Sequence, residues 1–432
     1  MKRSRRDSTP LDGTTPPRDT SSSRLNPFNF NMRFSFQISL DQGARGLQTT
    51  RQRAELKDAF ALELAAFTGL PIAEECTHVD SEDINLSKEN CDRCMRAAEN
   101  NTKIGDEHII ISRWPAQLPR GLHPLLHYYI VNMVPRELST AGTPLVEIRT
   151  PVYNGMVELS TEGPTKLDFL MTFGMGRALS GNAVADTNSR MAVAFSYRGG
   201  MTLLWAKRAA TLAMLLETTV CRWLSPADRL DLNDEAQIQT LSKFAKRTFP
   251  DDRVDLRLSY ECDDLRQNFP WDRLNITPGS WNHFEPDEFR ATLRLIWNTS
   301  SLDELAEGLR KAPELRNPHQ PLGFSISLRK DTPVYDERSA ANYSYEWSRT
   351  STLNFQYAPM DLNVDYIKRW GLFCWMLCQL ALLNSAEFAA GLGELINRLK
   401  EFDNDDTVGN ATRRIFFLLG LENHVSLINM LD

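Results

Sequence analysis

Four side chains of types that hold metal ions lie close together in the first quarter of the chain. They form one C-x-H pair and one C-x-x-C pair with twelve residues between the pairs, namely Cys76, His78, Cys91 and Cys94. Thiolate sulfur and imidazole nitrogen are the usual ligands of structural zinc, so this spacing defines a candidate zinc site. The alternative is an acidic, polar loop with unpaired cysteines. We favour this alternative because a C-x-H pair is not a common zinc-binding knuckle.

Four arginines form a second group of residues whose side chains could bind a ligand. They fall on the polar sides of alternating segments, namely Arg33, Arg149, Arg198 and Arg329. A planar guanidinium group donates paired hydrogen bonds that match a carboxylate or a phosphate. If the four arginines share one face, they define an anion-binding site. Each arginine taken alone fits a simpler role, in which it solvates the edge of a sheet.

The segments that must position these arginines alternate between apolar and polar side chains, which is the pattern of a half-buried strand. The pattern runs over residues 33–40, 191–198, 323–329 and 352–357. The polar sides of the first and last segments carry almost no carboxylates. If these faces meet in one cleft, the cleft is uncharged where an enzyme that uses metal and phosphate would be acidic.

Helical patterns and shorter strands complete the expected fold. Helices are expected over residues 53–69, 167–181, 203–224, about 286–297 and from 364 onward, and short strands over 108–112, 145–150 and 256–261. Strands with one apolar side are typical of an antiparallel sheet with one open face. The sequence therefore predicts an α+β fold, in which an antiparallel sheet forms a cradle with helices packed on one face.

The composition describes an ordinary soluble globular protein, with 42% hydrophobic and 24% charged residues among 432. The net charge of −7 argues against a nucleic-acid partner bound by bulk electrostatics. The most apolar stretch, residues 370–383, is shorter than the roughly 20 residues of a membrane-spanning helix. Within it, Cys374 and Cys378 are expected to be buried core thiols. We expect neither a nucleic-acid nor a membrane partner.

Residues 1–28 are rich in Ser, Thr, Pro, Asp and Arg and lack the apolar core of a secretory signal. Such a segment cannot bury enough apolar surface to offset its ordering entropy, so we expect a disordered arm before one domain over residues 29–432. The seven cysteines lack regular spacing and fit reduced thiols. We expect a cytoplasmic protein, and the basic run at residues 2–6 keeps a nuclear location open.

The order of these segments resembles the amidoligase family, carboxylate–amine ligases of the glutamine-synthetase-like superfamily. Family members open with an F-G-x-E-I-E strand, and residues 34–39 read F-S-F-Q-I-S. Their E-L-V-S-P strand is similar to V-E-I-R-T-P at residues 146–151. A G-x-H-V-H-V strand, a long helix ending L-x-P-x-x-R, and an E-F-R strand before a W-containing helix have counterparts at residues 191–198, 203–229 and 354–370. The resemblance implies a glutamine-synthetase-like catalytic domain.

The resemblance also implies which positions would carry the chemistry. In such ligases ATP phosphorylates a carboxylate and an amine displaces the acyl phosphate, while carboxylates hold Mg²⁺ against the triphosphate. Gln37 and Ser39 stand where the family's first strand has acids, and Asn354 and Gln356 where its last strand has an acid and an arginine. Only Glu147 keeps the family's residue type. The family's histidines fall on uncharged positions as well, Ala192, Ala194 or Ser196.

One carboxylate is a poor Mg²⁺ site, so we predict an amidoligase-like pseudoenzyme that acts in binding or regulation. Its expected partner is a small anionic ligand or another protein, and no cofactor is expected. The first alternative is a divergent active ligase that uses ATP and Mg²⁺, with ligands from new positions such as Asp106, Glu107 or Glu158. The second alternative is a structural protein that self-associates. The sequence leaves the oligomeric state open.

Overall fold

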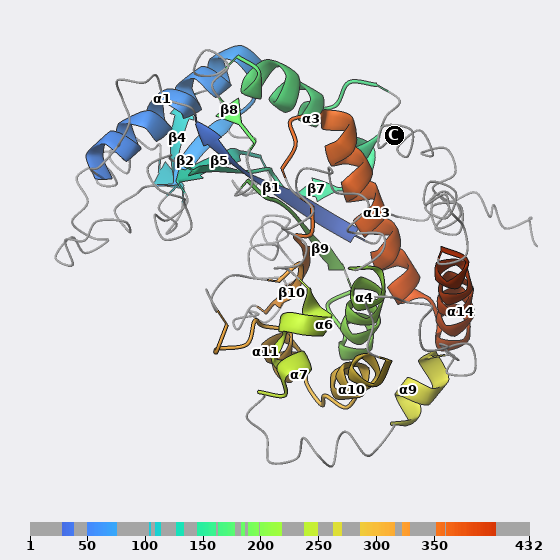
Figure 1. Cartoon of the computed structure of the whole chain (residues 1–432). Helices are drawn as coiled ribbons and strands as arrows, with labels where there is room; N and C mark the ends of the chain where they lie inside the picture. The colour runs from blue at the N-terminus through green and yellow to red at the C-terminus, as the bar shows by residue number, and fades with distance from the viewer. Residues whose placement is uncertain are drawn as a thin grey trace, which may run out of the picture.

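The computed structural model describes residues 28–38, 50–75, 103–104, 109–113, 127–133, 145–160, 163–177, 183–185, 189–197, 199–217, 237–248, 262–269, 286–315, 322–328, 351–358 and 360–402. In this part of the chain, eleven strands form one sheet, and helices arch over it (Figure 1). The predicted combination of a mostly antiparallel open sheet with helices is confirmed.

Nine strands follow one another across the sheet in the order β10, β11, β9, β1, β6, β5, β2, β4 and β3, while β7 and β8 pair with β1. β2 and β5 are parallel, and the other described pairs are antiparallel. β1, the longest strand, lies between β9 and β6 near the middle. The strands are β1 (Phe28–Ile38), β2 (Ile72–Glu75), β3 (Lys103–Ile104), β4 (Ile109–Arg113), β5 (Tyr129–Met133), β6 (Leu145–Arg149), β7 (Tyr153–Asn154), β8 (Ala183–Val184), β9 (Met191–Tyr197), β10 (Phe324–Ser327) and β11 (Thr352–Phe355).

β1 alternates between buried and half-buried residues along its whole length. Its even-numbered residues, from Phe28 to Ile38, are apolar and almost fully buried, whereas its odd-numbered residues, from Asn29 to Gln37, are polar and half-buried. Successive side chains of a strand point to opposite faces of a sheet, so β1 gives the sheet an apolar face and a polar face. We call the face that carries the odd-numbered residues of β1 the polar face.

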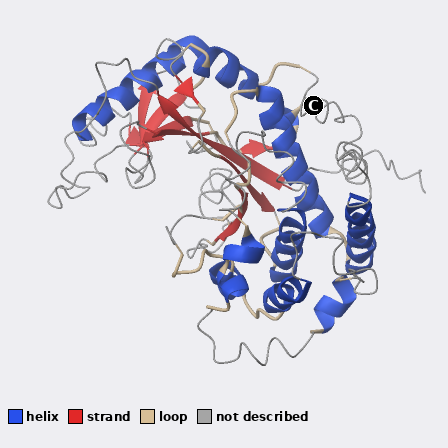
Figure 2. Cartoon of the chain, viewed as in Figure 1, coloured by secondary structure: helices blue, strands red, loops and turns tan. Residues whose placement is uncertain are grey.

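Helices cover the apolar face (Figure 2). At one end of β1, the rings of Phe28 and Trp375 on α13 lie 4.9 Å apart, and near the other end Phe36 lies 5.5 Å from Phe60 on α1. The described helices are α1 (Thr50–Thr68), η6 (Val157–Leu159), α3 (Lys166–Asp168), η7 (Phe169–Met175), α4 (Leu203–Leu216), α6 (Ile238–Leu241), α7 (Lys243–Lys246), α9 (Asp263–Asn268), α10 (Pro286–Trp297), α11 (Leu302–Gly308), α13 (Val364–Leu382) and α14 (Ser385–Phe402).

Most helices lie where the sequence predicts them. α1 ends at Gly69 as expected, because this glycine takes a left-handed φ of 66° and its N–H bonds the Ala65 carbonyl. The helix expected over 167–181 is instead a single turn, α3, followed by a π-helix, η7. In η7, a Cβ on Gly174 would lie 2.5 Å from Leu64 of α1, so the two helices approach closely there.

The strand predictions are confirmed for β1, β4, β6, β9, β10 and β11 within a few residues, apart from the start of β1. β1 begins at Phe28, five residues before the predicted start, because Asn29 and Asn31 continue the alternation. Asparagine is unfavourable in strands, which hid this part of the pattern. The strand predicted over 256–261 and residues 1–27 of the arm predicted over residues 1–28 lie outside the described residues. The last residue of that predicted arm, Phe28, is instead the buried first residue of β1.

The apolar run in α13 lies in the core. Cys374 and Cys378 are both fully buried there, which confirms the prediction of core thiols. Among the helices that the structure describes, none combines the length and the apolar character needed to cross a membrane.

Candidate functional site

The polar face of the sheet gathers several of the predicted site residues. Register partners in adjacent strands point to the same side of a sheet. β1 is antiparallel to both β6 and β9, and β9 is antiparallel to β11. Through these registers, the following predicted residues share the polar face: Arg33, Gln37, Glu147, Arg149 and Asn354.

Arg33 and Arg149 are direct register partners across β1 and β6. The Cβ atoms of such partners lie about 5 Å apart, so two guanidinium groups emerge side by side. Both residues are half-buried, and neither side chain forms a hydrogen bond or ion pair with another described residue. Like charges directly opposite each other destabilise a sheet, so the pair is unfavourable unless an anion lies against it.

Glu147 lies next to this pair and is the only carboxylate on β1, β5, β6, β9, β10 and β11. Its register partners are Ser35 on β1 and Asn132 on β5. Both partners are hydrogen-bonded to backbone: Ser35 Oγ donates to the Arg190 carbonyl at 3.0 Å, and Asn132 Oδ1 accepts from the Met133 N–H at 2.7 Å. Glu147 therefore faces neutral residues on both sides.

Asn354 lies at the other end of the polar face and is 2% exposed. Its Nδ2 donates to Ser327 Oγ at 2.9 Å and reaches the Ser325 carbonyl at 3.5 Å, while its Oδ1 accepts from Thr352 Oγ1 at 3.3 Å. The amide thus links β10 to β11. Because its donors and acceptor already have partners, Asn354 stabilises the sheet edge instead of facing a ligand.

Gln37 and Gln356 are not brought next to the arginine pair. Gln37 pairs with Leu145 and Val184 near the end of β1, about 14 Å along the strand from Arg33. Gln356 follows β11, and its N–H donates to the Gly323 carbonyl at 2.6 Å. The described site is therefore a patch of Arg33, Arg149 and Glu147, and Gln37, Asn354 and Gln356 lie away from it.

Several predicted residues lie outside the described residues, namely Ser39, Arg198, Arg329, Cys76, His78, Cys91 and Cys94. The zinc site and two of the four arginines therefore stay predictions. Within the described ranges, no three His, Cys, Asp or Glu residues are grouped so that they could hold a metal ion.

The sequence prediction missed two polar residues of the polar face. Asn29 and Asn31 precede Arg33 on this face and are half-buried. Neither side chain bonds to another described residue. The signal was present in the alternation that runs back from Arg33 to Phe28. Asn31 lies two residues from Arg33 and adds a neutral donor and acceptor next to the patch, whereas Asn29 lies as far from Arg33 as Gln37 does.

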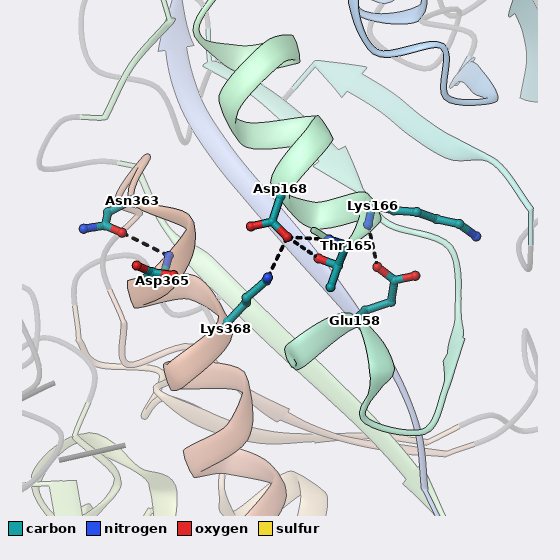
Figure 3. A network of polar contacts seen from close by, with 7 residues as sticks. All are labelled: Glu158, Thr165, Lys166, Asp168, Asn363, Asp365 and Lys368. Atoms are coloured by element: carbon teal, nitrogen blue, oxygen red, sulfur yellow. Dashed lines mark hydrogen bonds and ion pairs between the residues drawn. The ribbon is translucent and has the colours of Figure 1, made fainter. Parts of the chain in front are cut away.

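A second polar network lies on the helix-covered side, where α3 meets the first turns of α13 (Figure 3). The Lys368 ammonium group is 2.6 Å from Asp168 Oδ2, which also accepts from Thr165 Oγ1 at 2.8 Å. Glu158 Oε2 accepts the Lys166 N–H at 2.9 Å. Glu158 thus caps α3 and is separated from the polar face, so it supplies no metal ligand there. The other two acids suggested for that role, Asp106 and Glu107, lie outside the described residues.

Helix α4 carries two buried cations that cap other helices. Lys207 Nζ donates to the Trp297 carbonyl at 2.6 Å and the Thr299 carbonyl at 2.8 Å, at the end of α10. Arg208 donates to Asn268 Oδ1 at 2.7 Å, and also to the Ala381 carbonyl at 3.3 Å, at the end of α13. Carbonyl ends of helices favour positive charge, so both cations are structural.

Glu217, directly after α4, is fully buried. Its carboxylate accepts from the Ile238 and Gln239 N–H groups of α6 and from the Tyr357 hydroxyl, each at 2.8 Å. Burial raises the pKa of this carboxyl to about 8, although these three hydrogen bonds oppose the shift. Glu217 therefore links α4, α6 and the segment after β11.

In comparisons with known proteins, no family model, curated protein or solved structure matches this chain.

Proposed function

We propose that this chain is a binding protein that holds a small anionic ligand on the polar face, on an amidoligase-like scaffold that has lost its ligase chemistry. The observation that carries the proposal is the direct pairing of Arg33 with Arg149 across β1 and β6. Two adjacent guanidinium groups supply several donors to one carboxylate or phosphate. Because the pair is unfavourable without an anion, its presence favours a role in binding over a role in folding.

The strand order supports the scaffold part of the proposal. The four strand segments that resemble the amidoligases are β1, β6, β9 and β11, and they are neighbours in the order β11, β9, β1, β6. The described family-equivalent positions Gln37, Glu147 and Asn354 share one face through the observed registers. If the similarity of these four segments were due to chance, there would be no reason for them to form adjacent strands with these positions on one face.

The composition of the polar face supports the loss of ligase chemistry. Mg²⁺ in phosphoryl-transfer sites is held by one or two carboxylates together with the substrate phosphates, in a strict octahedral arrangement. Glu147 is the only acid on β1, β5, β6, β9, β10 and β11, and amides stand at Gln37 and Asn354. Replacement of an acid by an amide keeps the shape and removes the charge. We therefore propose that neither ATP nor Mg²⁺ is a working cofactor.

Isothermal titration calorimetry with acetate and inorganic phosphate tests the binding part. We expect saturable binding to the wild type at low ionic strength, and at least tenfold weaker binding to Arg33→Ala and Arg149→Ala. Arg266→Ala is the matched control, since this arginine lies on α9 with a side chain 60% exposed, and its affinity should equal that of the wild type. Equal affinities in all four proteins, or no binding to the wild type, would contradict the proposal.

Incubation with ATP, Mg²⁺ and pooled amines and carboxylates tests the loss of chemistry. We expect the wild type to release no more ADP than a Glu147→Gln variant. Release of ADP by the wild type that disappears in Glu147→Gln would instead identify a divergent active ligase.

A further inference from the structure

We propose that Glu147 makes the anion site selective for anions that carry a hydrogen-bond donor beside the anionic group, and that it disfavours dianions without such a donor, such as sulfate. This inference rests on the proposed anion site, and it concerns which ligands that site prefers.

The position of Glu147 places its carboxylate beside any anion that the arginines hold. Glu147 precedes Arg149 by two residues on β6, so the two side chains leave the same face about 7 Å apart along the strand. Its partner on β1 is Ser35, which is two residues from Arg33. Glu147 is therefore the same-strand neighbour of Arg149 and the diagonal neighbour of Arg33.

The register leaves this carboxylate without a cation directly opposite. Opposite charges that face each other across strands stabilise a sheet, and like charges destabilise it. In this patch arginine faces arginine, while Glu147 faces Ser35 and Asn132. Within the described part of the chain, Glu147 forms no ion pair or hydrogen bond. The three charged groups are arranged for a ligand rather than for one another.

A carboxylate beside two guanidinium groups adds an acceptor to a site of donors. A ligand whose anionic group meets the arginines can place a hydroxyl or ammonium group against Glu147. A dianion is repelled about twice as strongly as a monoanion, because Coulomb energy is proportional to charge. The separation of about 7 Å is shorter than the Debye length at physiological ionic strength, so salt screens this repulsion only partly.

Ligand-observed NMR titrations with acetate, glycolate and glycine, and displacement of acetate by sulfate, test the inference on the wild type and on Glu147→Gln. Glycolate adds a hydroxyl group to acetate and glycine adds an ammonium group, so two affinity ratios against acetate report the two kinds of donor separately. We expect at least one ratio above three in the wild type, and a fall of that ratio to near one in Glu147→Gln. The affinity for sulfate should rise at least threefold in the variant.

Glu288→Gln is the control, since this acid is exposed on α10, and it should leave all four affinities unchanged. Ratios near one in the wild type, or ratios that persist in Glu147→Gln, would overturn the selectivity. If acetate still binds and loses affinity in Arg33→Ala, only the selectivity is wrong. If no probe binds, or if Arg33→Ala changes nothing, the anion site is wrong and the selectivity fails with it.

Discussion

At the scale of single residues, the polar face contains two kinds of polar side chain. Asn354 is buried, and its amide is hydrogen-bonded within β10 and β11. Arg33 and Arg149 are half-buried and face each other without a described partner. The first kind holds the sheet together, and the second kind leaves donors for something else. This contrast assigns Asn354 to the stability of the sheet and is the basis for our proposal that Arg33 and Arg149 bind an anion.

Restoring an acid at Asn354 tests the structural assignment. We expect Asn354→Asp to lower the free energy of unfolding by about 2 kcal/mol at pH 7, because a buried carboxylate replaces the donor to Ser327. We also expect no gain of Mg²⁺ binding. Gln37→Glu is the control, since this residue is half-buried on the same face. The free energy of unfolding of this variant should stay near that of the wild type. Urea denaturation and Mg²⁺ titration measure both effects, and a stable variant that binds Mg²⁺ would disprove the assignment.

Removing one arginine tests the repulsion within the pair. We expect Arg149→Gln to raise the free energy of unfolding by about 0.5 kcal/mol at low ionic strength, because it removes a like charge opposite Arg33. The gain should shrink in 1 M salt, which screens the repulsion. Urea denaturation at the two salt concentrations is the measurement. A destabilised variant with the same deficit at both concentrations would mean that the arginines support the fold.

The sequence alone could place these arginines on polar sides of strands but could not pair them. The alternation around Arg33 and Arg149 is a local pattern, so it can be recognised from the sequence alone. Their direct opposition depends on the register between β1 and β6, which long-range pairing sets. A shift of one residue would turn one side chain to the other face.

At the scale of elements, buried polar groups of α4 and of the residue that follows it organise the helical part. Lys207 and Arg208 cap the carbonyl ends of α10 and α13, and the Glu217 carboxyl accepts the first N–H groups of α6. The two cations have the sign that a carbonyl end of a helix favours, whereas Glu217, with a pKa of about 8, is mostly neutral at pH 7. In the sequence these residues only argue against a membrane span, because burial of a charge depends on which helix ends meet it.

The pH dependence of stability tests the role of Glu217. The pKa of this carboxyl is about 8 in the fold, against 4.5 for an unperturbed glutamate, so between these pH values the folded state holds a proton that the unfolded state has lost. Its contribution is fully present below about pH 4.5 and is lost as the pH rises through about 8. We therefore expect the free energy of unfolding to decrease as the pH rises from about 4.5 to about 8. The part of this decrease that Glu217 causes should vanish in Glu217→Gln.

Urea denaturation from pH 4.5 to pH 9 measures this difference. Glu387→Gln, at an acid in the first turn of α14, is a suitable control and should keep the wild-type slope. Parallel pH profiles for the wild type and Glu217→Gln would show that Glu217 does not titrate in this range.

At the scale of the whole molecule, the sheet separates a helix-covered core from a polar face (Figure 2). The fold class could be predicted because one-sided strands and amphipathic helices are local patterns. The strand order could not, since it depends on contacts between distant segments such as β1 with β9 and β6. That order brings Arg33, Arg149 and Glu147 together from segments more than a hundred residues apart.

The most direct test of the anion site is a crystal structure of the chain soaked in 4-bromobenzoate, a monoanionic carboxylate that the anomalous scattering of its bromine locates without ambiguity. We predict its carboxylate within hydrogen-bonding distance of both the Arg33 and Arg149 guanidinium groups. Guanidinium groups that are instead paired with carboxylates of the chain, with no bromobenzoate between them, would contradict the account.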